Sequence, residues 1–173
     1  DKENCYNNPE YTSKSDKLVS LTKEMNKKLK GSITYKFGKQ VVVLDKNTYS
    51  SWLKIKKDYS GYKVDKNAME NWLLKFMYKY NTQYGWHKFK THDGRTKKIY
   101  GGPYGWRISK DKEMASVKKM LKEGTTETRE PYWREKAKVY DGVNGDIGDT
   151  YVEVDMGAQT VYYFKKGKLK YAT

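Results

Sequence analysis

The sequence predicts an α+β fold in which about three helices pack on a mostly antiparallel sheet, followed by a C-terminal β meander. Apolar residues recur every three or four positions in three separate segments, which is typical of helices with one buried face. Runs rich in β-branched and aromatic residues lie between glycine-containing turns, which is typical of hairpins. A hydrophobic content of 36%, with five tryptophans and seventeen tyrosines, is enough for a packed core.

Residues 1–15 include an Asn-Pro pair and several polar side chains, so we expect a lead-in or linker there. The first helix should begin at Ser15 or Asp16 and end at Gly31, because glycine suits the left-handed conformation that often follows a helix. Its apolar positions are Leu18, Leu21, Met25 and Leu29. Residues 32–44 then predict a first hairpin, with a two-residue turn at 38–39.

Asp45 can cap a short helical turn that buries Trp52 and Leu53. A long second helix is expected to begin after Asp65, because the apolar residues that follow form the clearest helical stripe of the chain. This stripe consists of Met69, Trp72, Leu73, Phe76, Met77 and Tyr80. We interpret it as the face that packs on the sheet.

Residues 86–108 are expected to form sheet around which the rest of the chain is organised, with a hairpin turn at 93–94. A two-residue loop would place Phe89 opposite Lys98, whereas a three-residue loop would place Phe89 opposite Ile99. The second register is favoured because it gathers the apolar side chains on one face.

Ser109 and Gly124 bound a predicted third helix, whose first turn contains the acidic residues Asp111 and Glu113. A strand over 125–130 should follow and end at Pro131. The helices that carry Leu21, Phe76 and Val117 are predicted to pack on an antiparallel sheet that contains Phe89 and Ile99.

These elements predict one domain over residues 16–131. Residues 132–148 are rich in Gly, Asp, Asn and Lys and are interpreted as a connector. Residues 149–173 alternate apolar and polar side chains between two turns, which predicts a β meander. This meander leaves unpaired edges and has too little apolar surface to be a domain by itself.

The formal charge of +15 and a pI near 9.6 predict attraction to polyanions such as nucleic acid, anionic membrane or an anionic wall polymer. No apolar run approaches the roughly 18 to 20 residues that span a bilayer. The chain begins at Asp1 without a signal-peptide pattern, so an upstream targeting signal is expected to lie outside it. Cys5 has only His87 and His92 as companions of a metal-binding type, which predicts no metal site.

The order of motifs over about residues 16–132 resembles the peptidoglycan-binding domain that precedes the catalytic domain in many Gram-positive L,D-transpeptidases. The motifs are Asn26-Lys27, Ile33 to Gly38, Val43 to Asp45, Trp52-Leu53, Phe89 to Gly94, Gly101 to Trp106 and Arg129 to Pro131. Residues 149–168 likewise resemble the opening strands of the YkuD-type catalytic domain. The lead-in resembles the exit from a preceding copy of the same domain, and the chain is expected to stop inside the catalytic domain.

The resemblance implies a cysteine nucleophile in a Ser-x-Gly-Cys-x-Arg type motif with an upstream histidine, and this motif is absent here. Cys5 lies at the other end of the chain and is not assigned to catalysis. We therefore expect no catalytic residues and no cofactor in this fragment. The parent protein is expected to be an L,D-transpeptidase, a cysteine acyltransferase that forms 3→3 peptidoglycan cross-links in cell wall biogenesis.

The favoured function is a non-catalytic, extracytoplasmic module at the cell surface that binds peptidoglycan and positions the transpeptidase domain. Expected partners are peptidoglycan, teichoic acid and the rest of the transpeptidase domain, in a parent anchored to the membrane upstream; nucleic acid is not expected. The candidate ligand-binding residues are Trp86, Tyr104, Trp106 and Arg107, since aromatic faces suit sugar rings and cations suit carboxylates or phosphates.

Two alternatives remain open. A basic nucleic-acid-binding domain is motivated by the charge and by interleaved Tyr and Lys, although no known nucleic-acid motif is present and the basic residues are spread along the chain. A carboxylate hydrolase would need a paired acid and base, such as Asp93 with Glu127 or Glu130.

Overall fold

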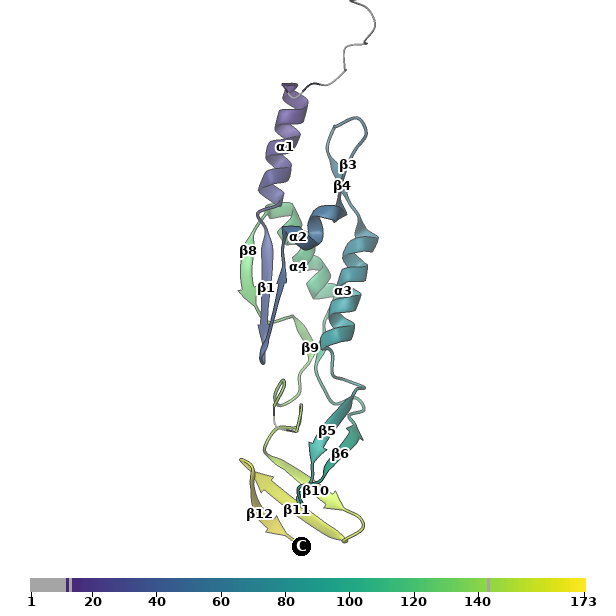
Figure 1. Cartoon of the computed structure of the whole chain (residues 1–173), viewed down its shortest axis with the longest axis vertical. Helices are drawn as coiled ribbons and strands as arrows, with labels where there is room; N and C mark the ends of the chain where they lie inside the picture. Colours follow the sequence, from purple (N-terminus) through teal and green to yellow (C-terminus); the bar gives the residue numbers. More distant parts are fainter. Residues whose placement is uncertain (1–11, 13, 143) are drawn as a thin grey trace, which may run out of the picture.

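The helices and strands follow one another along an elongated molecule (Figure 1). The computed structural model describes residues 12, 14–142 and 144–173. Most of the predicted lead-in, including Cys5, therefore lies outside the described residues. The helices are α1 (Asp16–Lys28), α2 (Lys46–Tyr49), the 3-10 helix η1 (Ser50–Trp52), α3 (Lys66–Tyr80) and α4 (Lys110–Glu123). The strands are β1 (Ser32–Phe37), β2 (Gln40–Leu44), β3 (Leu53–Ile55), β4 (Tyr62–Val64), β5 (Trp86–Lys90), β6 (Thr96–Tyr100), β7 (Arg107–Ile108), β8 (Thr126–Arg129), β9 (Trp133–Glu135), β10 (Tyr151–Asp155), β11 (Thr160–Lys165) and β12 (Lys168–Ala172).

The central sheet has the strand order β2–β1–β8. Strands β1 and β2 form the predicted hairpin, with Phe37 opposite Gln40 and a left-handed Gly38 (φ 52°) in the turn. Strand β8 pairs with β1 in the parallel direction, so Ser32 lies opposite Thr126. Parallel strands need a long crossover, and here the chain from β2 to α4 supplies it.

The core of the module lies between the central sheet and helices α3 and α4. The predicted stripe of α3 faces inward, because Met69, Leu73 and Phe76 are buried and Trp72 is partly buried against them. Val117 of α4 is also buried. The mixed α+β fold and the packing of α3 and α4 on a sheet are thus confirmed.

The ends of α3 and α4 follow the sequence signals, but the end of α1 does not. Asp65 accepts a hydrogen bond from the Ala68 N–H, and Gly124 takes the left-handed conformation after α4. Helix α1 instead ends at Leu29 with right-handed geometry. Gly31 packs closely on α4, because a Cβ there would lie 2.7 Å from the sulfur and 3.2 Å from the carbonyl oxygen of Met120.

The predicted position of Phe89 and Ile99 in the helix-bearing sheet is wrong. Strands β5 and β6 form a separate two-stranded sheet at the far end of the molecule from α1 (Figure 1). Helices α3 and α4 pack on the central sheet because Ile33, Tyr35 and Phe37 provide its fully or nearly fully buried face. The predicted packing of the Leu21 helix on the sheet is also wrong, since α1 packs against α4.

Both predicted registers of this hairpin are also wrong, since Phe89 lies opposite Lys97. The loop has three residues but is centred on Asp93, and the Thr91 N–H donates to the Arg95 carbonyl at 2.8 Å. The Asp93 carboxylate accepts from the Thr91 hydroxyl and the Arg95 N–H and fixes this turn. The shift from the favoured register is two residues, so each side chain keeps its predicted face.

Beyond the hairpin, β7 pairs with β9, and β10–β11–β12 form the predicted antiparallel meander, called here the C-terminal sheet. The segment predicted as a connector packs against the module. Phe37 lies edge-on to Trp133 and Tyr140, with ring centroids 5.5 and 4.9 Å away. Within the described residues, no helix has the length and apolarity to cross a membrane.

Candidate functional site

Three of the four predicted site residues contact the segments 133–142 and 144–146. Trp106 is only 9% exposed, and its indole N–H donates to the Val139 carbonyl at 2.6 Å. The Tyr104 hydroxyl donates to the Asp146 carbonyl at 3.1 Å. Arg107 is partly buried in β7, opposite Glu135. Trp106 therefore offers no ring face to a ligand in this structure.

A buried carboxylate lies behind Tyr104. Asp146 is 2% exposed, accepts a hydrogen bond from the Thr82 hydroxyl, and lies 4.0 Å from Nε2 of His87. Burial raises the pKa of Asp146 above its ordinary value. Gly101 leaves room for the His87 ring, because a Cβ there would lie 2.4 Å from Nε2. This cluster joins the hairpin to the segment that leads into the C-terminal sheet.

The inner face of the hairpin, formed by His87, Phe89, Lys97 and Ile99, is turned toward the C-terminal sheet. The Phe89 ring meets Tyr151 edge-on, with centroids 5.1 Å apart. A groove of about 450 Å³ remains between this face and β10. The inner face thus contacts the C-terminal sheet through Phe89 and lines a groove beside this contact.

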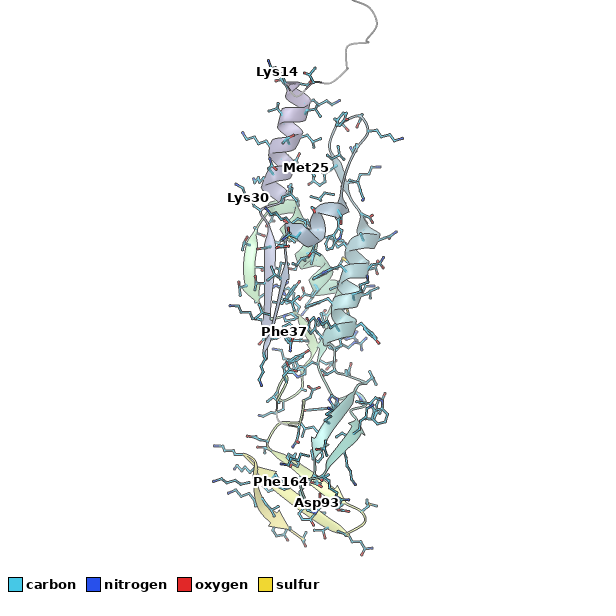
Figure 2. All side chains as sticks on the ribbon, in the orientation of Figure 1. Lys14, Met25, Lys30, Phe37, Asp93 and Phe164 are labelled. Atoms are coloured by element: carbon cyan, nitrogen blue, oxygen red, sulfur yellow. The ribbon has the colours of Figure 1, made fainter. Side chains whose placement is uncertain are left out.

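The hairpin loop makes the most specific contacts of this junction. Nδ1 of His92 lies 3.0 Å from Oε1 of Glu153, and the His92 backbone N–H donates to Oε2 at 2.9 Å. The imidazole also stacks on Tyr162, with ring centroids 3.9 Å apart. Asp93 in the same loop and Phe164 of β11 line one depression (Figure 2). Together these contacts fix the orientation of the hairpin on the sheet.

The outer face of the hairpin is formed by Trp86, Lys88, Lys98 and Tyr100, and it points away from the C-terminal sheet. The register places Trp86 opposite Tyr100 and Lys88 opposite Lys98. Trp86 is 62% and Tyr100 55% exposed, with ring centroids 5.5 Å apart. The sequence analysis selected Trp86 as a candidate but not Tyr100 or Lys98, although strand alternation places all four side chains on one face.

The acid and base of the hydrolase alternative are not brought together. Asp93 lies in the hairpin loop, where it forms an ion pair with Arg95. The hydrogen bond from the Thr91 hydroxyl is the main cause that lowers the pKa of Asp93 to about 2. Glu127 lies on β8 in the central sheet and binds Arg129. Within the part of the chain that the structure describes, no three His, Cys, Asp or Glu side chains are grouped to hold a metal ion.

Fold and site define a mixed α+β module whose hairpin is docked on the three-stranded C-terminal sheet. Residues 11–129 match the family described as "Putative peptidoglycan binding domain". The chain therefore belongs to this peptidoglycan-binding domain family. No curated protein sequence matches the chain.

Two solved structures of L,D-transpeptidases are similar to the chain. One is the Ldtfm-avibactam carbamoyl enzyme, at 27% identity and a TM-score of 0.66, over 90% of this chain and 60% of that chain. The other is a cysteine-to-serine mutant of the Enterococcus faecium L,D-transpeptidase, at 27% identity and a TM-score of 0.65, over 89% of this chain and 60% of that chain. The chain thus spans about 60% of the length of these structures, and the similarity extends past the end of the family match.

Proposed function

We propose that this chain is a non-catalytic module that binds peptidoglycan and positions an L,D-transpeptidase catalytic domain at the cell wall, outside the cytoplasm of a Gram-positive bacterium. The observation that carries the proposal is the two-sided hairpin β5–β6. It lies within the family match, and its inner face and loop dock on the C-terminal sheet through Phe89, His92 and Glu153. This docking fixes the position of the C-terminal sheet relative to the module for which we propose wall binding.

In the longer protein, we propose that the transpeptidase domain supplies the chemistry that makes 3→3 cross-links. The exposed side of the C-terminal sheet agrees with this. Val152, Val154 and Tyr171 are 61%, 59% and 60% exposed, and apolar side chains at this density usually pack against further structure. The net charge of +15 favours retention near wall-bound anions, including teichoic acid.

Sedimentation with purified Gram-positive cell walls tests the proposal. We expect the protein to sediment with the walls, and more weakly as salt rises, because exposed charges are screened over about 8 Å at physiological ionic strength. Tighter binding to duplex DNA, with no retention on walls at physiological salt, would favour the nucleic-acid alternative. Equal recovery with walls and with an uncharged polysaccharide resin would also contradict the proposal.

A further inference from the structure

The two faces of hairpin β5–β6 have different surroundings. Alternate side chains of a strand point to opposite faces, so the docking of Phe89 on Tyr151 turns Trp86 and Lys88 away from the C-terminal sheet. Trp86, Lys88, Lys98 and Tyr100 are all exposed. The outer face is therefore available to a partner while the inner face stays docked.

The aromatic half of the outer face presents apolar surface to water. Among the described residues, the other rings that pack with a neighbour, such as Tyr35 and Phe76, are buried or partly buried. Trp86 and Tyr100 pack on each other at 55° but keep more than half of their surface exposed. Large rings held rigidly and left open to solvent are typical of a binding surface, because covering them releases water from apolar area.

The basic half of the outer face consists of Lys88 and Lys98. Lys88 and Lys98 lie directly opposite each other across the hairpin, an arrangement that disfavours the strand pair through repulsion. Nζ of Lys98 lies 5.3 Å from the Trp86 ring centroid. Among the described residues, neither lysine forms an ion pair with a carboxylate. An anion between the two ammonium groups would relieve their repulsion.

We propose that the outer face is a binding site for the glycan–peptide unit of peptidoglycan, with a sugar ring on Trp86 and Tyr100 and a stem-peptide carboxylate between Lys88 and Lys98. This inference rests on the proposed function and assigns it a site. Sugar rings present C–H faces that pack on aromatic rings, and lysines form charge-assisted hydrogen bonds with carboxylates. A phosphate polymer would use the lysines but not the rings, so the juxtaposition of both favours the glycan–peptide unit.

Four variants and two controls test this site on walls stripped of teichoic acid. Trp86→Ala and Tyr100→Ala should each weaken binding by about tenfold, the equivalent of a lost aromatic contact. Lys88→Gln and Lys98→Gln should weaken binding at low salt and reduce its salt dependence. The matched controls are Tyr78→Ala, which removes a 92% exposed tyrosine of α3, and Lys75→Gln, which removes an exposed lysine of the same helix. Both controls should bind like the wild type.

The outcomes separate the site from the proposed function. If the wild type binds stripped walls but Trp86→Ala binds equally well, the outer face is not the site and the module binds elsewhere. If binding vanishes for the wild type when teichoic acid is removed, the ligand is the phosphate polymer and the site assignment is overturned. If the wild type never binds walls, the proposed function fails together with the site. Urea unfolding of each variant checks that a loss of binding is not a loss of fold.

Discussion

Glu113 is a fully buried carboxylate that ties α4 to β1 and β8. It accepts hydrogen bonds from the Tyr35 hydroxyl at 2.9 Å and from two guanidinium nitrogens of Arg129 at 2.8 and 2.9 Å. Burial, followed by the charge of Glu113, raises the pKa of Tyr35 far above its ordinary value. The carboxylate therefore compensates the buried guanidinium and keeps the phenol protonated.

Replacing Glu113 by alanine should destabilise the module strongly. Arg129 would then remain buried without its main partner, and breaking a buried ion pair costs about 3 to 5 kcal/mol. The matched control is Glu127→Ala, which removes a partly exposed partner of the same arginine and should cost about 1 kcal/mol or less. Urea unfolding measures both changes. Equal losses in the free energy of unfolding for the two variants would show that the burial of Glu113 does not increase the cost of removing it.

The pH dependence of stability should contain a contribution from Asp146. Burial raises its pKa in the folded state, so the folded protein binds a proton more readily than the unfolded chain. Its contribution to stability is present in acid and is lost as the pH rises from near 3.8 through the raised pKa. Asp146→Asn lacks this loss and keeps an acceptor for the Thr82 hydroxyl. We expect the variant to gain stability relative to the wild type as the pH rises above about 4 toward the raised pKa of Asp146.

Urea unfolding of both proteins across this range checks the expectation for Asp146. The difference between the two free energies of unfolding isolates Asp146 from the other carboxylates. A difference that stays flat, or that favours the wild type increasingly as the pH rises, would contradict it.

At the scale of elements, hairpin β5–β6 depends on its loop to hold the C-terminal sheet. Replacing His92 by alanine removes the Nδ1 contact with Glu153 and the stacking on Tyr162. We expect faster amide hydrogen exchange in β10 and β11 and unchanged exchange in β1 and β2, because the module core does not involve this loop. Lys168→Gln, at an exposed position of β12, serves as control. Unchanged exchange in β10 would show that the sheet is held by other contacts.

Caps, turns and helical stripes could be predicted from the sequence because each depends on residues that are close together in the chain. The cap at Asp65, the turn at Gly38 and the stripe that carries Phe76 each depend on residues close in sequence. The parallel pairing of β1 with β8 could not be predicted, because it joins Ser32 to Thr126 across most of the module. The hairpin register was missed because the Asp93 side chain, rather than apolar gathering, sets the loop.

The same distinction applies to the candidate site. Trp86 could be selected as a candidate because an aromatic residue in a basic, turn-rich segment is a local feature. Trp106 was chosen for the same reason but is buried, because its indole N–H reaches the carbonyl of Val139, 33 positions away. Tyr100 and Lys98 become neighbours of Trp86 only through the correct pairing. Whether an aromatic ring is exposed depends on the tertiary structure and cannot be predicted from residue types alone.

At the scale of the whole molecule, the chain should carry no transpeptidase activity. The acyl transfer that we propose for the longer protein needs a thiolate beside an imidazole and donors for an oxyanion. Incubation with a carbapenem followed by intact-mass spectrometry should give the unmodified mass. Cys5→Ala is the control and should leave wall binding and unfolding unchanged. A stoichiometric adduct that disappears in Cys5→Ala would contradict the non-catalytic assignment.

The pairing of β1 with β8 also means that a chain cut in the exposed loop between β3 and β4 would stay together. The first fragment would keep β1 and β2, and the second would keep α3, α4 and β8. Tyr35 on the first fragment would still pack on Phe76 and bind Glu113 on the second, and Ser32 would still face Thr126. A protease that reaches Lys56 or Lys57 would thus convert the module into a noncovalent heterodimer. The two pieces, made separately, could reassemble as β8 pairs along the free edge of β1.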